Sequence, residues 1–263
     1  MQKISVLIPV FNEGERLKIV FNALVQEWPK EFKLKELIFV NDGSTDKTLQ
    51  LIKKQSKILA KILKVPVKIV SYKQNYGKGY AVKKGMAIAT GDLLLLTDVD
   101  MSTPFSELKK FLIDKKLANK VMVGTRKNGH STVTIAQPLY RQILGRIFTY
   151  LAQFILDLKV SDFTCGFKLF TKDAYKRIYP LMQINRWGYD AELLFLAKKN
   201  DFTISEKPVT WANDQRSKVS LLKDIIRSLA DLFIIRLNDW RGIYTPASAR
   251  DNLKVGILSW FKI

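Results

Sequence analysis

Two aspartates, Asp98 and Asp100, directly follow a run of four leucines in the stretch "LLLLTDVDMSTPF". The leucine run predicts a buried strand, and residues two apart in an extended chain point to the same side. Carboxylates held side by side repel each other unless a cation lies between them. Ser102, Thr103 and Pro104 are typical of a helix start, which explains these three residues but leaves the paired aspartates unexplained. We therefore favour a metal site over capping and surface charge.

Apolar and amphipathic segments alternate through the first 126 residues. Strands are predicted at 3–11, 34–40, 65–72, 92–98 and 120–126, and helices at 13–28, 44–63, 80–89 and 105–117. This alternation predicts an α/β fold with a mostly parallel sheet flanked by helices. Ligands bind such sheets at the carboxyl ends of the strands. Polar residues gather there in this sequence: Asn12, Glu13, Asn41, Asp42, Gln74, Asn75, Asp98, Asp100, Thr125 and Arg126.

Two later helices are predicted near residues 138–157 and 218–237, each with an apolar stripe edged by basic residues. This pattern is typical of a helix lying in a membrane interface, and a packed core helix is the alternative. The formal charge of +20, from 44 Lys and Arg against 24 Asp and Glu, suggests an anionic partner such as a nucleic acid, a lipid surface or a phosphorylated ligand. A generally lysine-rich composition would give the same charge without a partner.

Hydrophobic runs in this sequence are short. No stretch of 18 uncharged apolar residues occurs, so we expect no transmembrane helix and no signal peptide. The tail 239–263 ends in "LKVGILSWFKI", which is too short to span a membrane and is expected to lie at its interface. The chain has one cysteine, Cys165, and one histidine, His130. We expect the cysteine to be a buried small side chain rather than a nucleophile.

Seven motifs occur in a specific order: "SVLIPVFNEGERL", "FVNDGSTDKT", "NYGKGYAVKKGM", "TGDLLLLTDVDMSTP", "GTR", "DFTCGFKLF" and "RWGYDAELLFLA". Their order resembles that of family 2 glycosyltransferases with the Rossmann-like GT-A fold. Within the family the chain is most similar to the polyprenyl-phosphate sugar synthases, the dolichyl-phosphate glucosyltransferases and mannose synthases. The resemblance covers about residues 3–238, which we therefore expect to form the catalytic domain 1–238, including the two amphipathic helices.

The resemblance implies an enzyme that moves a sugar from a nucleotide-sugar to the phosphate of a polyprenyl or dolichyl phosphate, with inversion and with Mg²⁺ or Mn²⁺. UDP-glucose is the favoured donor, because "DVDMSTP" and "DFTCGFKLF" look like the glucosyl branch. The alternatives are a GDP-mannose-dependent synthase and a family 2 enzyme with a non-polyprenyl acceptor. A divalent ion offsets the charge of the leaving diphosphate. It needs only one or two protein carboxylates when phosphate oxygens and waters complete its shell.

Residue roles follow from the same resemblance. Nucleotide-sugar binding is implied for Pro9, Phe11, Glu13, Val40, Asp42, Gly77, Lys78, Asp98 and Val99. Metal binding is implied for Asp98, Asp100 and Ser102, although Ser102 stands where mannose synthases commonly carry glutamine. The catalytic candidates are Asp100, Asp162, Asp190 and Arg126, with capping or an ion pair as the alternative for Asp162 and Asp190. The candidates for binding the acceptor phosphate, besides Arg126, are Arg141, Lys168, Arg216 and Lys218, with a solvated surface cation as the alternative for each.

Other classes of protein fit the sequence less well. A nucleic-acid-binding protein is disfavoured, because the basic residues form no single arm and no known binding signature occurs. A glycosidase would also use two carboxylates, but the ordered motifs argue against it. A non-catalytic membrane adaptor would not need Asp98 and Asp100. We expect peripheral association with an anionic membrane on its cytoplasmic, inner face, with a separate membrane protein as a further expected partner.

Overall fold

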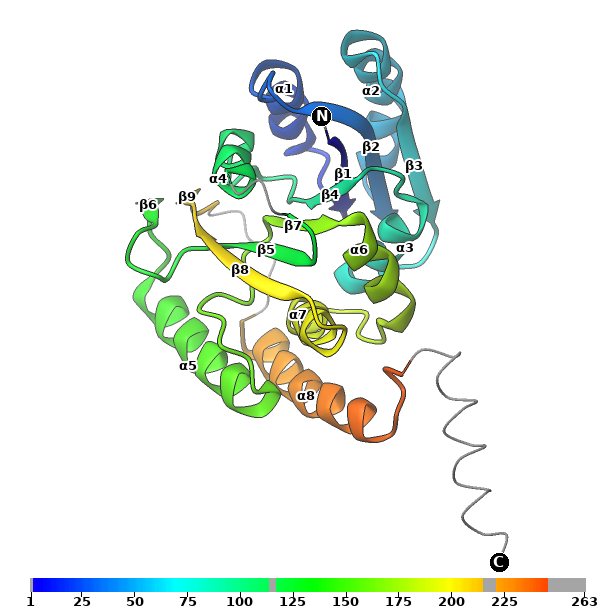
Figure 1. Cartoon of the computed structure of the whole chain (residues 1–263). Coiled ribbons are helices and arrows are strands. Elements are labelled where there is room, and N and C mark those ends of the chain that lie inside the picture. The colour runs from blue at the N-terminus through cyan, green and yellow to red at the C-terminus, as the bar shows by residue number, and fades with distance from the viewer. Residues whose placement is uncertain (1, 114–116, 215–220, 246–263) are drawn as a thin grey trace, which may run out of the picture.

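The computed structural model describes residues 2–113, 117–214 and 221–245, with helices packed on both faces of a central sheet (Figure 1). The seven strands lie in the order β3-β2-β1-β4-β7-β5-β8. Their bounds are β1 Lys3–Val10, β2 Lys33–Asp42, β3 Val67–Tyr72, β4 Leu93–Leu96, β5 Lys120–Thr125, β7 Lys168–Thr171 and β8 Thr203–Pro208. A second, two-stranded sheet pairs β6 Thr132–Ile135 with β9 Thr210–Ala212. The predicted mostly parallel sheet is confirmed.

One strand departs from the expected strict alternation. β7 pairs antiparallel with β4 on one side and with β5 on the other. Sequence periodicity did not indicate this strand, because it has four residues and begins with a lysine. Its insertion still leaves β4 and β5 running in the same direction, so the carboxyl ends of β1, β2, β4 and β5 meet at one edge.

Helices cover both faces of the sheet because the strands are apolar on both sides, as expected for a buried, mostly parallel sheet. In β4, Leu94 and Leu96 join the core on one face, and Leu93 and Leu95 join the core on the other. The first core is covered by α3 Lys78–Ile88, α5 Leu139–Leu156, α6 Lys172–Ile178, α7 Tyr189–Lys199 and α8 Leu221–Trp240. The second is covered by α1 Leu17–Gln26, α2 Thr48–Leu63 and α4 Leu108–Leu112. Burying each such leucine stabilises the fold by about 1.5–3 kcal/mol.

The segment after Asp100 forms less helix than its sequence predicts. A 3₁₀ turn, η1 Phe105–Glu107, is followed by the short α4, which ends at Leu112 instead of 117; residues 114–116 lie outside the described part. No side chain caps η1. The backbone N–H of Ser102 instead donates to Asp100 Oδ1 at 3.0 Å. A helical turn therefore begins at the predicted residue, Phe105, with Pro104 at its N-cap position, but without the side-chain cap that the sequence suggested.

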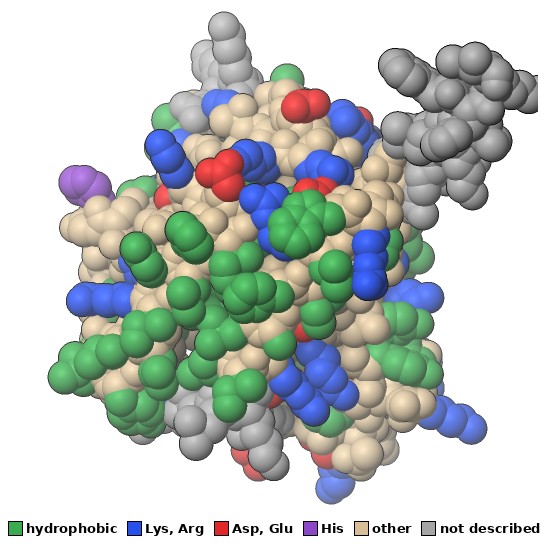
Figure 2. Space-filling view, turned by 90° about the horizontal axis from the view of Figure 1, so that it is seen from below, with side chains coloured by type: hydrophobic (Ala, Val, Ile, Leu, Met, Phe, Trp, Pro, Cys, Tyr) green, Lys and Arg blue, Asp and Glu red, His purple; other side chains and the backbone are tan. Residues whose placement is uncertain are grey.

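The helices α5 and α8 pack against each other along one side of the molecule (Figure 1). Each has a buried side, with Phe148 and Ala152 on α5 and Leu232 and Ile235 on α8. Each also carries large exposed apolar side chains: Leu139, Tyr140, Ile143, Ile147, Tyr150 and Phe154 on α5, and Ile226, Phe233, Ile234, Leu237 and Trp240 on α8. Figure 2 shows hydrophobic side chains gathered on this side, with lysines and arginines among and around them. We call these exposed residues the apolar helix surface.

In the part of the chain that is described, none of the helices is both long and apolar enough to cross a bilayer. Residues 218–220 of the second predicted amphipathic helix, and the end of the tail from residue 246, lie outside the described residues. The domain boundary at residue 238 stays a prediction, because α8 continues to Trp240.

Candidate active site

A cavity of about 550 Å³ opens at the carboxyl ends of β1, β2, β4 and β5. Most of the residues predicted for the site line it: Pro9, Phe11, Glu13, Asp42, Gly77, Lys78, Asp98, Val99, Asp100, Ser102, Arg126, Arg141 and Asp190. Three others lie outside this lining. Val40 is part of the core, and Asp162 and Lys168 are fully buried. Arg216 and Lys218 fall outside the described residues.

The two aspartates after β4 differ in the charges that surround them. Lys78, at the start of α3, places its Nζ 2.6 Å from Asp98 Oδ1. Burial alone would raise the pKa of Asp98, but this ammonium, together with the charges of Lys168 and Arg16, outweighs burial and leaves the pKa lowered. Burial, and then the negative charge of Asp98, raise the pKa of Asp100. Asp100 therefore lies beside a carboxylate whose charge is only partly compensated, as expected where a further cation binds.

The donor atoms around this pair suit a divalent cation that also binds phosphate. Asp98 and Asp100 both line the cavity, and a Cβ at Gly166 would come within 2.0 Å of Asp98 Oδ2, so only glycine leaves room for this carboxylate. Among the described residues, no group of three or more His, Cys, Asp or Glu could hold a metal. Mg²⁺ commonly uses one or two carboxylates and takes its other ligands from water and phosphate. The residues therefore fit a cation that arrives together with a diphosphate.

Arg16 is a site residue that sequence reasoning missed. It is almost fully buried, and its Nε and Nη2 each donate to the Glu13 carboxylate at 2.5 Å. Its Nη1 lies 3.5 Å from Asp214 Oδ2 and 3.9 Å from Asp100 Oδ2. The spacing of Glu13 and Arg16, three residues apart, could have indicated their pair. The contact with Asp214 joins residues that are 198 positions apart, so no local sequence pattern could have indicated it.

Asp42 lines the cavity and also holds the loop that forms part of the cavity wall. Its Oδ2 accepts hydrogen bonds from Asn75 Nδ2 and from Gly77 N, both at 2.8 Å, and its Oδ1 accepts one from Tyr76 N at 2.9 Å. The loop after β3 needs these acceptors, because buried backbone N–H groups must be paired. Gly77 has φ of +110°, which favours glycine. The predicted hydrogen bond from a nucleotide base to Asp42 stays a prediction, since Asp42 also lines the cavity.

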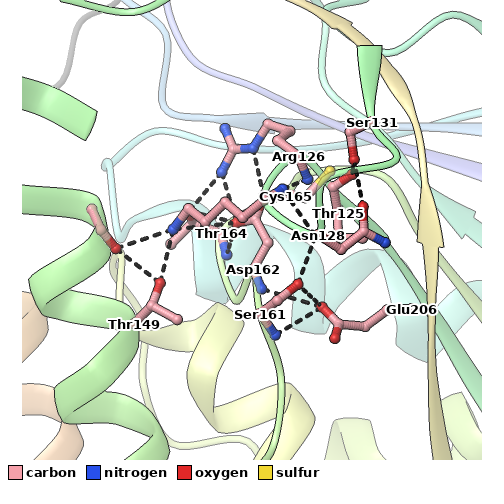
Figure 3. Close-up of polar contacts among 12 residues, drawn as sticks. Thr125, Arg126, Asn128, Ser131, Thr149, Ser161, Asp162, Thr164, Cys165 and Glu206 are labelled. Atoms are coloured by element: carbon pink, nitrogen blue, oxygen red, sulfur yellow. Dashed lines mark hydrogen bonds and ion pairs between the residues drawn. The ribbon is translucent and has the colours of Figure 1, made fainter. Parts of the chain in front are cut away.

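Arg126, at the end of β5, is held by the buried Asp162 (Figure 3). Its Nε lies 2.6 Å from Asp162 Oδ2 and its Nη2 2.8 Å from Oδ1, a bidentate arrangement that fixes the plane of the guanidinium. Burial would raise the pKa of Asp162, but Arg126 outweighs burial and keeps the pKa far below its usual range. Asp162 therefore pairs with Arg126 and orients it, so the ion-pair interpretation is confirmed, and Asp162 is not among the residues that line the cavity.

A further carboxylate supports Asp162 from the neighbouring strand. Glu206 of β8 accepts hydrogen bonds through Oε1 from Ser161 N at 2.9 Å and from Ser161 Oγ at 2.6 Å (Figure 3). It also accepts one from Asp162 N at 3.2 Å. The guanidinium of Arg126 meanwhile lies 5.1 Å from the centre of the Trp211 ring. The arginine therefore reaches the cavity from a fixed position.

Lys168 and Asp190 form a second buried pair. The Nζ of Lys168 donates to the Asp190 carboxylate and, at 2.7 Å, to the carbonyl oxygen of Cys165. Lys168 is fully buried because β7 lies in the middle of the sheet, so it does not reach the phosphate site predicted for it. Asp190 lines the cavity and is held in place by this lysine. Cys165 is buried, as expected, and burial raises the pKa of its thiol.

The far wall of the cavity comes from the two amphipathic helices. Arg141 of α5 lines it, and its Nε is buried without a hydrogen-bond partner in the part of the chain that is described. A buried donor without a partner is costly, so this position is suited to an anion. Leu144 and Phe148 of α5 and Ile225 of α8 continue the wall. The cavity is thus lined by carboxylates, arginines and apolar side chains.

The buried pair gives a stability prediction. Asp162→Asn keeps the size of the side chain but removes the buried counter-charge of the partly buried Arg126 guanidinium, so the free energy of unfolding should fall by about 3–5 kcal/mol. The matched control is Asp173→Asn, since Asp173 pairs with Arg177 at 3.6 Å on the surface, and it should cost less than about 1 kcal/mol. Denaturant unfolding measures both. Equal losses would contradict the role assigned to the Asp162 charge.

Comparisons with known proteins agree with this arrangement. The sequence model of glycosyl transferase family 2 matches residues 5–179. Dolichyl-phosphate beta-glucosyltransferase of Saccharomyces cerevisiae is 33% identical, over 95% of this chain and 78% of that protein. The protein of the same name from Dictyostelium discoideum is 30% identical, over 92% of this chain and 76% of that protein.

Solved structures give the fold. Glucosyl-3-phosphoglycerate synthase of Mycobacterium tuberculosis, in a complex with Mn²⁺, UDP-glucose and phosphoglyceric acid, matches with a TM-score of 0.64 at 17% identity, over 89% of this chain and 79% of that chain. At this identity the likeness shows the fold alone, and it supports the GT-A fold predicted from the motifs. With the family match over residues 5–179 and relatives similar over most of their length, the chain is a glycosyltransferase and belongs to glycosyl transferase family 2.

Proposed function

We propose that this enzyme transfers glucose from UDP-glucose to the phosphate of a dolichyl or other polyprenyl phosphate, with inversion. The observation that carries the proposal is one cavity that joins the Asp98–Asp100 pair, the cations Arg126 and Arg141, and an apolar helix wall. The names of the relatives support the sugar and the lipid acceptor. The UDP-glucose and Mn²⁺ in structures with the same fold support the donor and the metal.

The donor side of the cavity would hold the diphosphate. Asp98 and Asp100 would hold a Mg²⁺ or Mn²⁺ ion, which when bound would offset the charge of the leaving diphosphate. Lys78 supplies a positive charge beside the same carboxylates. Arg16 keeps Glu13 in place at the neighbouring strand end. These groups are fixed before the reaction, and fixed charges stabilise a developing charge better than mobile ones.

The acceptor side would hold the lipid phosphate. A phosphate monoester has its second pKa near about 6, so at neutral pH it is already a nucleophile and needs no strong base. The enzyme's task is to bind and aim it, which Arg126 and Arg141 are placed to do. Asp190, held by Lys168, is placed to contact a sugar hydroxyl. Arg216 and Lys218 remain proposed acceptor residues.

The apolar helix surface would face the membrane that carries the lipid acceptor. Leu144 of α5 and Ile225 of α8 line the cavity, and other residues of the same helices form the exposed surface, so a polyprenyl chain could pass from one to the other. The charge of +20 favours an anionic membrane. We place the enzyme on the cytoplasmic face, as a peripheral protein with a separate membrane partner.

A transfer assay tests the proposed reaction. Purified protein with Mn²⁺ or Mg²⁺ and a polyprenyl phosphate in detergent is given UDP-glucose, UDP-galactose, UDP-GlcNAc or GDP-mannose in parallel. We expect a lipid-soluble product from UDP-glucose, and we expect a chelator to abolish it. Asp100→Asn should lower the rate by at least about 100-fold. The control is Asp92→Asn, since Asp92 lies at the opposite end of β4 and accepts from Lys3 N.

The outcomes of this assay separate the alternatives. A lipid product from GDP-mannose alone would contradict UDP-glucose as the donor, and the enzyme would be a mannose synthase. Transfer to a soluble acceptor without a lipid product would contradict the polyprenyl acceptor. An Asp100→Asn variant as active as Asp92→Asn would contradict the role of the aspartate pair.

Arg141 gives a prediction for the acceptor alone. Arg141→Gln removes the charge but keeps a long polar side chain, so the KM for polyprenyl phosphate should rise about 10-fold or more, since hydrogen bonds to charged groups contribute about 1.5–3 kcal/mol. The affinity for UDP should not change. Arg146→Gln is the control, because Arg146 is exposed on the same helix and does not line the cavity. A weaker affinity for UDP with an unchanged KM for the lipid would contradict this assignment.

The membrane proposal is tested with vesicles. The double variant Phe154→Ser with Phe233→Ser removes two exposed aromatic rings, 80% and 63% exposed, from the apolar helix surface. Its binding to vesicles of anionic phospholipid should weaken at least about 10-fold, because burying a phenylalanine contributes about 1.5–3 kcal/mol. Ile62→Ser on α2, where Ile62 is 53% exposed, is the control. Equal losses of vesicle binding in the double variant and in Ile62→Ser, or no loss in the double variant, would contradict the proposal that the apolar helix surface binds the membrane.

A further inference from the structure

The segment 182–188, between the 3₁₀ turn η2 Tyr179–Leu181 and α7, forms one wall of the cavity; we call it the 182–188 loop. Arg186 and Trp187 of this loop line the cavity. The Trp187 ring centre lies 5.9 Å from Lys78 Nζ, which in turn pairs with Asp98. The loop therefore contacts the cation of the donor side directly.

The loop lies on the start of α3. The carbonyl oxygen of Asn185 accepts a hydrogen bond from Tyr80 N at 3.1 Å. A Cβ at Gly77 would come within 2.4 Å of the same carbonyl oxygen, so the two backbones are in direct contact there. A displacement of the loop would consequently move Trp187 relative to Lys78.

Glu192 of α7 is hydrogen-bonded to the first half of the loop. It is fully buried, and its carboxylate accepts hydrogen bonds from Gln183 N at 2.8 Å and Ile184 N at 2.9 Å. The hydroxyl of Tyr244, also fully buried, donates to the same carboxylate at 2.6 Å. Tyr244 follows the end of α8. The carboxylate thus connects the loop to the segment after α8.

Asp231 of α8 holds the second half of the loop. Its Oδ2 accepts a hydrogen bond from Gly188 N at 3.2 Å. A Cβ at Gly188 would lie 2.4 Å from Asp231 Cβ, so the backbone of the loop rests directly on α8. Neither Asp231 nor Tyr244 is among the residues that line the cavity, so both act on the site only through the loop.

We propose that Asp231 and Tyr244 are positioning residues, through which α8 sets the 182–188 loop against Lys78 in the donor cavity. The same helix carries Phe233 and Trp240 of the apolar helix surface. The element proposed to face the lipid acceptor therefore also determines the donor wall. The inference rests on the proposed function only for the identity of the donor.

Amide hydrogen exchange tests the two connections without any ligand. Tyr244→Phe removes one hydroxyl, and Asp231→Ala removes the acceptor of Gly188 N but keeps the Cβ. Exchange at Gln183, Ile184 and Gly188 should be about 10-fold faster in these variants. Exchange in β1 serves as the reference for global stability. Asp231→Asn keeps an acceptor oxygen and should behave like the wild type. The matched control on α8 is Asp239→Ala, which removes an ion pair with Lys199.

Calorimetric titration with UDP and Mn²⁺ tests the effect on the donor cavity. The Kd for UDP should rise about 10-fold in Tyr244→Phe and Asp231→Ala and stay unchanged in Asp231→Asn and Asp239→Ala. Unchanged exchange in the loop would contradict the connections. Faster exchange with an unchanged Kd would contradict their effect on the donor site. A wild-type protein that does not bind UDP would contradict the proposed donor, while the exchange comparison would still decide this inference.

Discussion

Mutual repulsion of carboxylates is the constraint on which the cavity depends. The strand ends bring Glu13, Asp98, Asp190 and their neighbours into one space, where unpaired charges would be costly. Each is held by a cation from a different element: Arg16 for Glu13, Lys78 for Asp98 and Lys168 for Asp190. Asp100 accepts a hydrogen bond from Ser102 N at 3.0 Å, and among the described residues its ion pair is a distant one, with Arg16 at 3.9 Å. In the described part of the chain, the weakly compensated carboxylate is thus the one beside which a metal and a diphosphate are proposed to bind.

The half of the cavity that is proposed to hold the acceptor depends on how α5 is attached to the sheet. Lys127, next to Arg126, donates from its Nζ to the carbonyl oxygen of Gly145 at 3.0 Å and to Thr149 Oγ1 at 2.8 Å. The turn of α5 beside the cavity is therefore bonded to the strand end that carries Arg126. On the other side of the cavity, Asp231 of α8 is hydrogen-bonded to Gly188 of the 182–188 loop. Both helices with exposed apolar faces are consequently connected to the polar site.

Sequence reasoning found what local patterns encode and missed what distant contacts determine. Asp98 and Asp100 were predicted because an apolar strand and its polar end are adjacent in the chain. The burial of Lys168 was not predicted, because a lysine without a charged neighbour in the sequence usually lies on the protein surface. Its charge is compensated by Asp190, 22 residues away. The hydrogen bonds from Asp42 to the loop after β3 were not predicted either, because they leave no trace in residue spacing. The exposed sides of α5 and α8 likewise depend on tertiary packing, which periodicity alone does not give.

The most direct test of the central claim is the position of the metal in the cavity. Crystals grown with UDP and Mn²⁺ would be measured at the manganese absorption edge, where anomalous scattering locates the ion. The account predicts a single manganese peak beside the Asp98 and Asp100 carboxylates, together with the diphosphate of UDP. UDP in the cavity with manganese elsewhere, or UDP bound outside the cavity, would contradict it.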